Sequence, residues 1–431
     1  MESKKIKLDF IVIGAGIAGL TAAYELKKRN KQVIVLEKNN FVGGRMSAKI
    51  IDGISFSLGA QFITPFYKNM NSYIKEFNLE IEKLSIGKLA IKRNGRLYNF
   101  DSDNLFSLFL FKGLSFENKL RLLFSLLTKL IEARKIDLYD ISSYLQYDNT
   151  NIYDDLIKFI GQDGIDYFID PMLNSVFGYS SKEFSKALFL AVLTKLFNSK
   201  LYSFKGGINQ LVLKLASQLD VRKNFEVISV KRLGNKVIVT AGAELNDNLV
   251  FETDKVIIAV PGNKVLGILN SPNKIEQDFF SKVEYSKLGY VFFKSKETLL
   301  KDIETVWLPK RESKYFASFG INNKLKDIFY YSIELRNNII DELTNGKNID
   351  LKDLIRQQTG INNLEIMHIQ LWQSAVPKFK PGYLIAMNKF LQTMNKNNKI
   401  YYCGDYLENP STEGALTSGL KIVRLINDNK Y

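Results

Sequence analysis

Runs of apolar residues bounded by glycines or polar turns divide the start of the chain into predicted strands and a helix. Residues 8–14 form a continuous apolar run that ends in glycine, which is typical of a buried parallel strand. GLTAAYELKKRN (residues 19–30) has helical spacing with small residues for close packing, and QVIVLE (residues 32–37) predicts a second strand. The chain therefore opens with a predicted strand–helix–strand unit.

The pattern changes twice further along the chain. From about residue 90 to 200 it is mostly helical, and its longest amphipathic stretch is FENKLRLLFSLLTKLIEARK. An α/β alternation resumes at GGINQLVLKLASQL (residues 206–219), and DKVIIAVP (residues 254–261) predicts another buried strand. Residues 275–395 mix strands such as YVFF and IFYYSIEL with a helix. The segments KIYYCGD and STEGALTSGLKIVRLI then restore the initial pattern.

This alternation predicts an α/β protein with two interleaved domains. We expect a Rossmann-like, nucleotide-binding domain built from three pieces, and an inserted α+β substrate-binding domain built from two. The nucleotide-binding domain would comprise residues 1–90, 204–272 and 397–431. The substrate-binding domain would comprise residues 91–203, which are largely helical, and residues 273–396, which mix strands and a helix.

A glycine-rich turn joins the first predicted strand to the first predicted helix. Gly14, Gly16 and Gly19 form a GxGxxG pattern. The first glycine permits a tight turn, the second lets a ligand approach the backbone, and the third lets helix and strand pack closely. The helix N-terminus offers N–H groups to phosphates. Glu37 ends the second strand, within reach of the adenosine ribose hydroxyls. Strand, helix and acid together predict a dinucleotide site.

Composition and charge exclude several classes of function. The 431-residue chain has a formal charge of +15, but no basic run is interleaved with a nucleic-acid-reading motif, so we expect no nucleic-acid partner. The sequence has one cysteine, Cys403, so an internal disulfide is excluded. It has one histidine, His368, which argues against a His-based metal site and against a Ser-His-Asp triad. We therefore expect no metal. No apolar run is long enough to span a bilayer, which favours the cytoplasm.

One region is a candidate for peripheral contact with a membrane. LFSLFLFKGLSF (residues 105–116) is strongly apolar, and the stretch that follows has apolar helical spacing with basic residues on the other face. A helix with this pattern either packs against a neighbouring part of the protein or lies on a membrane surface. The sequence leaves both alternatives open.

The stretch LEKNNFVGGR (residues 36–45) distinguishes between dinucleotides. Two glycines and an arginine, Gly43, Gly44 and Arg45, follow the acid Glu37 past the second strand, where a plain NAD-binding domain has no specific need for them. Here the chain resembles the flavin-containing amine oxidase superfamily, which also contains protoporphyrinogen oxidases and carotene desaturases. The resemblance implies that this segment folds back over the cofactor's diphosphate, with Arg45 in the phosphate region.

Other stretches support the same resemblance and extend it from residue 8 to residue 425. GISFSLGAQF is similar to a family segment beside the flavin ring, and YYCGDYLENPSTEGALTSG is similar to the family's C-terminal signature. The resemblance implies that Val227 meets the adenine through its backbone. It also places Gly404 and Asp405 near the ribityl chain and the opening of the last helix under the flavin. The implied FAD-contacting residues are Gly14, Gly16, Ala18, Gly19, Glu37, Lys38, Gly43, Gly44, Arg45, Gly59, Ala60, Gln61, Val227, Gly404, Asp405, Glu413, Gly414 and Ala415.

The resemblance also implies the reaction type. A flavin accepts a hydride at N5, while the protein positions the substrate and tunes the ring. Ser411 and Thr412 replace the cage tyrosine of monoamine-oxidising members, and the segment LWQSAVPKFKPGY lacks the cysteine that binds flavin covalently in them. We therefore expect noncovalent FAD. The resemblance leaves the catalytic residue open, with Lys287, Gln61 and Trp372 as candidates. Tyr290 joins Gln61 and Trp372 as a candidate pocket residue.

The sequence favours an FAD-dependent oxidoreductase similar to protoporphyrinogen oxidases, acting on a hydrophobic small molecule. IDPMLNSVFGYSSKEFSKAL and WQSAVPKFKPGY resemble segments of those enzymes, although Tyr383 stands where a histidine is usual. Three alternatives stay open: an amine or amino-acid oxidase or dehydrogenase, a carotenoid-type desaturase, and a non-catalytic flavin-binding protein. The electron acceptor could be oxygen or a quinone. The signature residues serve the cofactor and do not identify the substrate.

Overall fold

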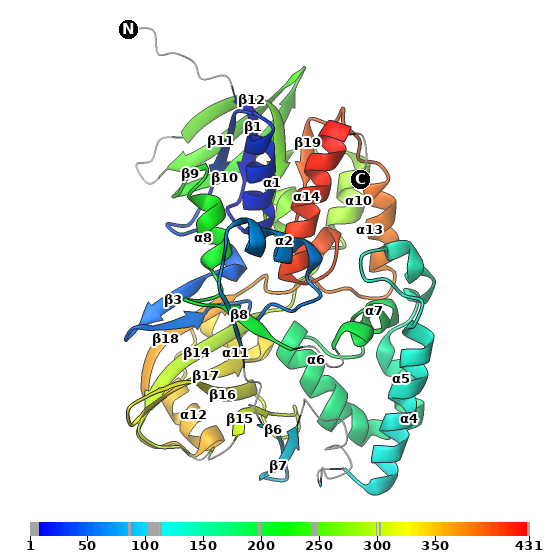
Figure 1. The fold of residues 1–431 in the computed structure, drawn as a ribbon, viewed down its shortest axis with the longest axis vertical. Coiled ribbons are helices and arrows are strands. Elements are labelled where there is room, and N and C mark those ends of the chain that lie inside the picture. The colour runs from blue at the N-terminus through cyan, green and yellow to red at the C-terminus, as the bar shows by residue number, and fades with distance from the viewer. Residues whose placement is uncertain are drawn as a thin grey trace.

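Two β-sheets and a group of helices make up the computed structural model. It describes residues 8–84, 88–101, 112, 114–196, 200–243, 248–298, 300 and 303–428. The larger sheet has eight strands and the other has seven. Figure 1 shows the larger sheet at the top, the other at the lower left and a group of helices at the lower right. Most of the apolar stretch at residues 105–116 lies outside the described residues.

The eight-stranded sheet has a parallel centre because the strand–helix–strand unit predicted at the start forms there. Buried strand β1 lies between β12 and β2 and pairs in parallel with both, and β9 continues the parallel pairing beyond β2. On the other side of β12 are the antiparallel strand β11 and the parallel strand β19. The strands are β1 (Leu8–Ile13), β2 (Val33–Leu36), β9 (Asp220–Arg222), β10 (Phe225–Leu233), β11 (Lys236–Ala243), β12 (Asn248–Ile258), β13 (Leu269–Asn270) and β19 (Ile400–Tyr402).

Helices from both ends of the chain pack together beside this sheet. A Cβ atom on Gly419 would lie 2.5 Å from the carbonyl oxygen of Ala18, so the helices that hold these two residues, α14 and α1, touch at their backbones. Buried apolar residues of β1, α1, β12 and α14 belong to one hydrophobic core. The neighbouring helices are α1 (Ile17–Lys28), α2 (Lys68–Glu76), α8 (Gln210–Ala216), α9 (Val265–Ile268), α10 (Lys274–Phe280), α13 (Tyr383–Leu391) and α14 (Thr412–Asp428).

The seven-stranded sheet follows the order β18-β14-β17-β16-β15-β6-β7 and is antiparallel except where β15 meets β6. It draws strands from three separate parts of the chain. They are β6 (Lys88–Arg93), β7 (Arg96–Asp101), β14 (Leu288–Ser295), β15 (Ile303–Trp307), β16 (Phe316–Leu325), β17 (Ile328–Leu335) and β18 (Glu365–Trp372). Two short ribbons, β3 (Ala48–Ile51) with β4 (Ile54–Ser57) and β5 (Ile81–Lys83) with β8 (Tyr202–Phe204), lie outside both sheets.

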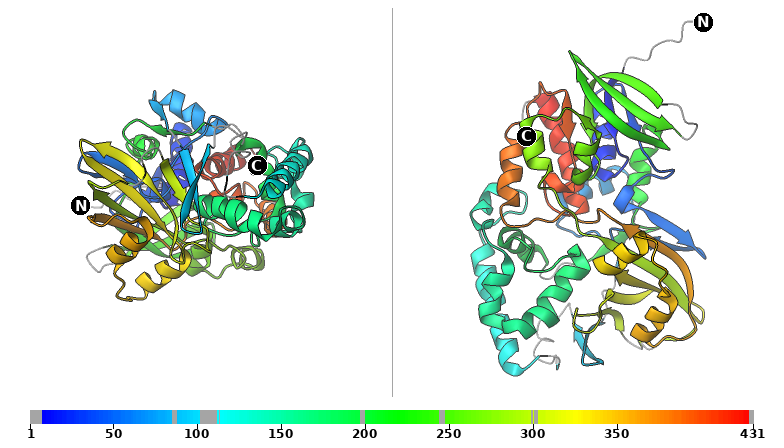
Figure 2. Two further views of the ribbon diagram at one scale, coloured as in Figure 1. Left: turned by 90° about the horizontal axis from the view of Figure 1, so that it is seen from below. Right: turned by 180° about the vertical axis from the view of Figure 1, so that it is seen from behind.

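Alternating residues give the seven-stranded sheet two different faces. Val291, Phe293 and Ile333 pack against α11 (Asn337–Thr344) and α12 (Leu351–Thr359), which cover one face (Figure 2). The residues between them point the other way, and a cluster there includes Tyr290, Phe292, Tyr330, Phe56 and Leu58. Phe56 lies on β4 and Leu58 follows it, so this second face meets the segment that follows the glycine-rich turns.

Residues predicted to be largely helical form α4 (Phe116–Ala133), α5 (Ile152–Gly164), α6 (Asp170–Phe177) and α7 (Lys186–Leu196). Tyr144 lies fully buried between these helices and the rest of the core. Within the described parts of the chain, no helix is long and apolar enough to cross a membrane.

The start of the predicted helical region is instead a β-hairpin. β6 and β7 pair antiparallel, with Arg93 opposite Arg96, and the two residues between them form the turn. Those residues, Asn94 and Gly95, have φ values of 51° and 74°. Asparagine and glycine favour this left-handed backbone, which closes a two-residue hairpin with the correct twist. The helical prediction from residue 90 onward was wrong for these strands.

Candidate active site

The three glycines of the GxGxxG turn at the end of β1 have two different kinds of surroundings. Gly14 has a φ of 103°, and a Cβ atom there would lie 2.9 Å from the carbonyl oxygen of Ala259. A Cβ atom on Gly19 would lie 2.1 Å from the carbonyl oxygen of Gly14. A Cβ atom on Gly16 would meet no atom within 4 Å. The first and third glycines therefore permit close packing inside the protein, whereas Gly16 borders open space.

Glu37 follows β2, and its carboxylate holds the glycine-rich turn. Its Oε2 accepts a hydrogen bond of 2.8 Å from the backbone N–H of Ala15. Its Oε1 accepts bonds of 2.9 and 2.7 Å from the backbone and side-chain nitrogens of Asn39. Glu37 is buried, while its neighbour Lys38 is exposed. The contact of Glu37 with a ribose stays a prediction. Its hydrogen bond to the N–H of Ala15 also stabilises the glycine-rich turn.

The segment containing Gly43 and Gly44 folds back onto the glycine-rich turn. The Gly43 N–H donates a 2.8 Å hydrogen bond to the carbonyl oxygen of Ala15, and Gly43 forms a β-bridge with Gly16. Both glycines have positive φ values, 101° and 52°. A Cβ atom on Gly44 would lie 3.8 Å from the Cα atom of Gly16 and near nothing else. Gly16 therefore faces open space where the two turns meet, which leaves room for the diphosphate of a dinucleotide to approach the backbone.

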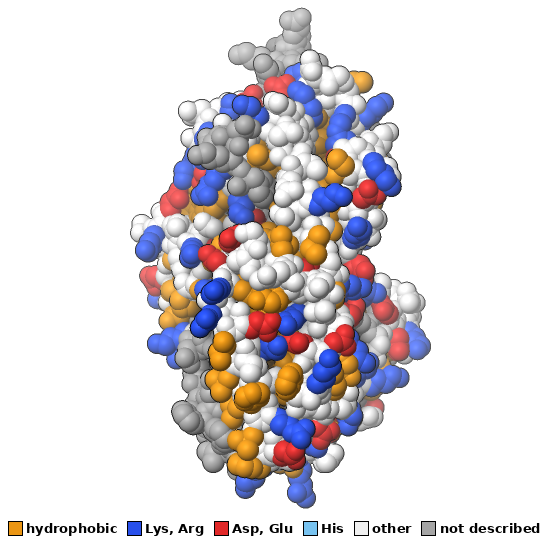
Figure 3. Space-filling model, turned by 90° about the vertical axis from the view of Figure 1, so that its right-hand side faces the viewer, with side chains coloured by type: hydrophobic (Ala, Val, Ile, Leu, Met, Phe, Trp, Pro, Cys, Tyr) orange, Lys and Arg blue, Asp and Glu red, His pale blue; other side chains and the backbone are white. Residues whose placement is uncertain are grey.

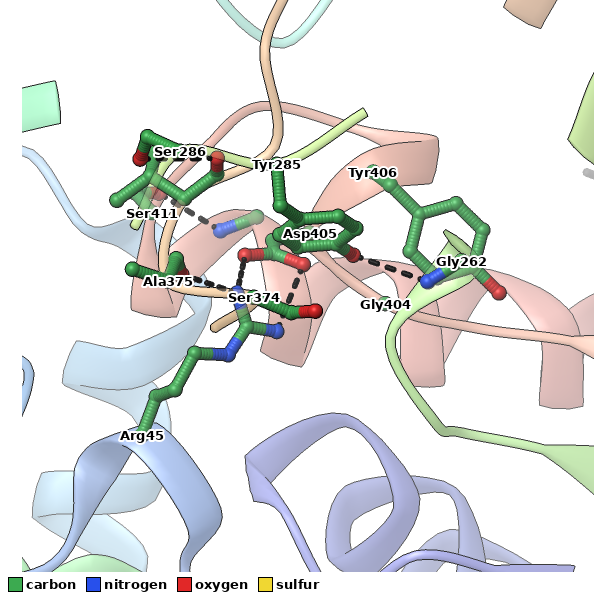
Figure 4. Close-up of polar contacts among 12 residues, drawn as sticks. Arg45, Gly262, Tyr285, Ser286, Ser374, Ala375, Gly404, Asp405, Tyr406 and Ser411 are labelled. Carbon is green, nitrogen blue, oxygen red and sulfur yellow. Dashed lines mark hydrogen bonds and ion pairs between the residues drawn. The ribbon is translucent and has the colours of Figure 1, made fainter. Parts of the chain in front are cut away.

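Arg45 joins distant segments in a polar cluster (Figure 4). Its guanidinium donates to both carboxylate oxygens of Asp405, at 2.6 and 3.0 Å, and to the carbonyl oxygen of Ala375 at 2.7 Å. It also lies 5.4 Å from the centre of the Tyr285 ring. The Tyr285 hydroxyl accepts a 3.0 Å hydrogen bond from the backbone N–H of Gly262.

The charge of Arg45 in this cluster is stabilised by its partners. Burial disfavours the guanidinium charge, but the Asp405 carboxylate and the Tyr285 hydroxyl together outweigh burial and raise the pKa of Arg45 above its ordinary value. Burial also raises the pKa of Tyr285, so its hydroxyl stays protonated. The bidentate pairing commits the charge of Arg45 to Asp405. The predicted approach of Arg45 to phosphate stays a prediction, because the structure assigns its two outer nitrogens to Asp405 and Ala375.

The residues after β4 lie directly on the Arg45 backbone. Ala60 donates a 2.7 Å hydrogen bond to the carbonyl oxygen of Arg45. A Cβ atom on Gly59 would lie 2.3 Å from that same oxygen, so only glycine fits without movement. The predicted site residues from the two segments, residues 43–45 and 59–61, are therefore in direct contact.

The C-terminal signature forms the end of β19 and the start of α14. Gly404 donates a 2.7 Å hydrogen bond to the hydroxyl of Ser418. Gly414 donates a 2.9 Å bond to the hydroxyl of Ser411, which satisfies one N–H of the first turn of α14. Ala415 donates to the carbonyl oxygen of Ser411 at 3.0 Å. The last helix therefore begins where the sequence predicted.

Glu413 has a structural partner that the sequence did not indicate. Its carboxylate accepts bonds of 2.8 and 2.9 Å from the backbone N–H groups of Asn69 and Met70, in the first turn of α2. The Tyr139 hydroxyl donates to it at 3.2 Å. Burial raises the pKa of Glu413, and the two backbone N–H groups oppose this shift. The side chain of Glu413 therefore caps α2.

Two further predicted contact residues, Ala18 and Val227, are buried. Ala18 lies on α1 against Gly419, as described above. Val227 lies on β10 opposite Ala241, where the strand register shifts before Ser229. A register shift leaves backbone groups of β10 outside the regular ladder. This geometry suits a backbone contact with a ligand, and the adenine contact itself stays a prediction.

Three of the four substrate-side candidates come together on the second face of the seven-stranded sheet. The Gln61 side chain lies near the Tyr290 hydroxyl, and its Nε2 donates to the Gly59 carbonyl at 2.9 Å. Trp372 Nε1 donates to the Leu58 carbonyl at 2.6 Å. Tyr290 and Trp372 lie on neighbouring strands, β14 and β18. These contacts attach the sheet to the segment that rests on Arg45.

Lys287 lies apart from this group. Its Nζ forms an ion pair with Asp341 on α11, and about one third of the lysine side chain is exposed (35%). Helix α11 covers the opposite face of the sheet. The structure therefore does not place the Lys287 amine with Gln61 and Trp372.

Sequence reasoning missed a buried acid, Glu334, on β17. It lies in register between Tyr290 and Ser318 and is 3% exposed. Its Oε2 accepts a 2.8 Å hydrogen bond from the Ser318 hydroxyl, and its Oε1 has no partner among the described residues. Burial raises the pKa of Glu334 to about 8. The only signal in the sequence was one acid within the apolar run IFYYSIEL.

Cys403 follows β19 and is fully buried, and burial raises the pKa of its thiol. Across the part of the chain that the structure describes, no group of three or more His, Cys, Asp or Glu side chains could hold a metal ion.

Comparison with known proteins is consistent with this geometry. The family model described as flavin containing amine oxidoreductase matches residues 17–427. Protoporphyrinogen oxidase 2 of Arabidopsis thaliana is 21% identical, covering 96% of this chain and 93% of that protein. A putrescine oxidase triple mutant has a TM-score of 0.78 at 18% identity and covers 98% of this chain and 99% of that one. A putative protoporphyrinogen oxidase from Exiguobacterium has a TM-score of 0.76 at 14% identity, with coverage of 98% and 99%.

Proposed function

Because the chain belongs to the flavin containing amine oxidoreductase family, and is thus an FAD-dependent oxidoreductase, we propose that it oxidises a hydrophobic, porphyrinogen-like substrate. The observation that supports the cofactor is the open space that Gly16 faces where its turn meets the turn at Gly43–Gly44. It lies at the carboxyl ends of β1 and β2, where parallel sheets bind nucleotides.

The residues that would hold FAD are those around this space. The N–H groups at the start of α1 would face the diphosphate, and Gly16 would let it approach the backbone. Arg45 and Asp405 would fix the turn on which Gly59 and Ala60 rest. When bound, FAD supplies the two-electron chemistry by accepting the hydride. We infer that it is held without a covalent bond, because the single cysteine of the sequence, Cys403, is fully buried.

The chain's own residues would place the substrate. Gln61, Tyr290 and Trp372 line the segment next to Arg45, and the surrounding cluster of Phe56, Leu58 and Phe292 is apolar. Such a surface excludes water and suits a flat, hydrophobic substrate. The substrate would lose a hydride from a C–H bond and a proton from a neighbouring C–H or N–H bond, and a new double bond would form. Oxygen or a quinone would then take the two electrons.

Two plant relatives support the porphyrinogen-like substrate over the alternatives. The proteins named protoporphyrinogen oxidase from Arabidopsis thaliana and Nicotiana tabacum are similar over 96% of this chain. The solved structures named putrescine oxidase favour the second candidate, an amine. Lys287 does not add support to the amine candidate, because it is paired with Asp341 on the far face of the sheet.

The proposal is tested by the absorption spectrum of the purified protein during anaerobic addition of substrate. We expect a flavin band that bleaches with protoporphyrinogen and does not bleach with primary amines. Bleaching by amines alone would replace the first candidate with the second. If no substrate bleached the band, the proposed turnover would be refuted in favour of a flavin-binding protein. Readmission of oxygen or addition of a quinone then identifies the acceptor by the rate at which the band returns.

We also propose that α4 brings the protein into peripheral contact with an anionic membrane. Five large apolar side chains lie on its outer side at spacings of three or four residues, and we call them the α4 face. Their exposed fractions are 67% for Phe116, 45% for Leu120, 61% for Phe124, 58% for Leu127 and 64% for Ile131. Figure 3 shows apolar side chains gathered on this side of the molecule, with basic side chains close by.

The charges around the α4 face favour an anionic surface. Exposed Arg121, Arg134 and Lys135 border it, and Glu117 is paired with Arg121. Apolar anchoring combined with basic residues is the pattern of helices that lie in a membrane interface. The formal charge of +15 adds long-range attraction to such a surface.

Co-sedimentation with phosphatidylglycerol vesicles tests this contact. The double variant Phe124→Ser with Leu127→Ser should lose at least about ten-fold in vesicle affinity, since each residue buries apolar area in the interface. A matched control is Leu233→Ser with Val250→Ser, whose side chains are 56% and 66% exposed elsewhere. Equal binding of the two double variants would refute the α4 contact. Failure of the wild type to bind vesicles, with a dimer in solution, would assign the face to a protein partner.

A further inference from the structure

A pocket of about 340 Å³ lies where the end of β14 meets α12, and most of its charged lining is basic. Its volume is in the range of pockets that hold small molecules. The charged side chains that line it come from β14 and the residue after it, from α12 and from the start of β18. They are Lys294, Lys296, Lys352, Arg356 and Glu365.

The pocket is separate from the surfaces assigned above to the cofactor and the substrate. Tyr285, which lies against Arg45, precedes β14, whereas Ser295 at the other end of this strand lines the pocket. A strand of eight residues spans roughly 23 Å, at about 3.3 Å per residue. Helix α12 also covers the face of the sheet opposite Tyr290. The pocket therefore has no part in the site around Gly16 and Arg45.

The acid in the lining is already engaged. Glu365 lies 3.5 Å from Nζ of Lys294, and Asp52 lies 3.0 Å from the same nitrogen. Among the described residues, no ion pair or hydrogen bond is formed by the amines of Lys296 and Lys352 or by the two outer nitrogens of Arg356. Three positive charges therefore converge on the pocket without a counter-ion, and an anion between them would relieve their repulsion.

Hydrogen bonds fix the border of the pocket and the orientation of its arginine. Nε of Arg356 donates to the carbonyl oxygen of Asn362 at 2.9 Å. The backbone N–H groups of Asn362 and Asn363 donate to the carboxylate of Glu297 at 2.8 and 3.2 Å. The hydroxyl of Ser295 donates to the carbonyl oxygen of Asn363 at 2.6 Å. The guanidinium is thus held by one nitrogen, which leaves the other two for a ligand.

We propose that this pocket binds a phosphorylated small molecule that carries at least two negative charges. Lys352 and Arg356 are four residues apart on α12 and share one side of the helix, and Lys296 reaches the same pocket from β14. The planar guanidinium suits two phosphate oxygens, while each lysine supplies a compact charge. A single carboxylate would leave most of the positive charge unbalanced. The volume limits the occupant to a small molecule, and the inference does not depend on which substrate the flavin oxidises.

The test is calorimetric titration of the FAD-loaded protein with inorganic pyrophosphate at about 0.15 M salt. Bound FAD occupies its own diphosphate site, and an unchanged flavin spectrum confirms that it stays there. We expect saturable one-to-one binding that weakens at least about 30-fold in the double variant Lys352→Gln with Arg356→Gln, since each charge-assisted contact is worth about ten-fold or more. The control, Lys158→Gln with Lys389→Gln, removes the same two charges from exposed positions on α5 and α13 and should stay within about two-fold. Thermal unfolding confirms that each variant is folded.

Four results would overturn the proposal. The first is the absence of saturable binding to the wild type. The second is equal affinity in the wild type and the variant of Lys352 and Arg356, and the third is equal weakening in both double variants, which would reduce the effect to net charge. The fourth is tighter binding of a hexaglutamate peptide than of pyrophosphate through the same two residues, which would assign the pocket to an acidic protein partner. Acetate at matched ionic strength should not displace pyrophosphate, and displacement would refute the requirement for two charges.

Discussion

Replacing Gly16 with alanine should weaken cofactor binding strongly without destabilising the cofactor-free protein. Gly16 has φ and ψ of −75° and 173°, an extended conformation that any residue can adopt. A Cβ atom at this position would meet no protein atom within 4 Å. The free energy of unfolding should therefore change little, or rise by up to about 1 kcal/mol, because alanine restricts the unfolded chain more than glycine does.

The same methyl group would occupy the space in which a diphosphate must approach the backbone. Each charge-assisted hydrogen bond lost there is worth about 1.5–3 kcal/mol. Losing one or two such bonds would weaken FAD affinity by roughly 10- to 10,000-fold at about 1.4 kcal/mol per factor of ten. The control is Gly19→Ala, in which the Cβ atom would lie 2.1 Å from the Gly14 carbonyl oxygen. That variant should be unstable even without FAD.

The assay is urea denaturation of the FAD-free proteins combined with titration of FAD by the quenching of flavin fluorescence. We expect Gly16→Ala to unfold like the wild type and to bind FAD weakly, and Gly19→Ala to unfold at lower urea concentrations. Wild-type affinity in Gly16→Ala would refute the assignment of this space to the diphosphate. A loss of stability in Gly16→Ala equal to that in Gly19→Ala would refute the steric argument.

Three further predictions concern buried polar groups. The folded-state pKa of Glu334, about 8 against an ordinary 4.5, favours the protonated carboxyl group in the folded protein. The contribution of this carboxyl group to the free energy of unfolding should therefore be fully present below about pH 4.5 and lost as pH rises through 8, by up to about 5 kcal/mol. Glu334→Gln, denatured at several pH values, should lose less stability over this pH range than the wild type. Identical pH profiles of the two proteins would contradict the raised pKa. Asp405→Asn should lower the free energy of unfolding by about 1–3 kcal/mol, because it leaves the Arg45 charge without its counter-ion; an unchanged urea midpoint would argue against the pair. Glu413→Ala should destabilise the protein by about 2 kcal/mol or more, since two backbone N–H groups of α2 lose their acceptor, and hydrogen exchange at Asn69 and Met70 should accelerate; unchanged protection there would show that the cap is dispensable.

Local patterns predicted the first part of the fold because their physical causes are local. An apolar run that ends in glycine, followed by small residues at helical spacing, gave β1, α1 and β2 as observed. The turn at Gly43 and Gly44 was also predictable in position, because positive φ values at consecutive residues need glycine. The hairpin of β6 and β7 was missed although the Asn94–Gly95 pair was a sufficient signal. The helical periodicity of the residues that follow had favoured a helix over this hairpin.

The substrate side could not be predicted in the same way because it depends on strand register. Lys287 is close in sequence to Tyr290, yet it reaches α11, while Tyr290 lies on the opposite face. A shift of one residue along a strand exchanges the two faces, and no local pattern reveals which face meets the cofactor. Glu334 has polar neighbours only because β14 and β16 place Tyr290 and Ser318 beside it. Those pairings join residues that are distant in sequence.

One continuous path of contacts links the cofactor turn to the buried acid. Gly43 bridges to Gly16, and the turn that it opens presents the Arg45 carbonyl oxygen to Ala60. The next residue, Gln61, lies near Tyr290, which stands in register with Glu334. The segment that holds Gly43, Arg45 and Ala60 therefore connects the glycine-rich turn to the second face of the seven-stranded sheet. A change at Gly59, where a Cβ atom would lie 2.3 Å from the Arg45 carbonyl oxygen, would disturb both at once.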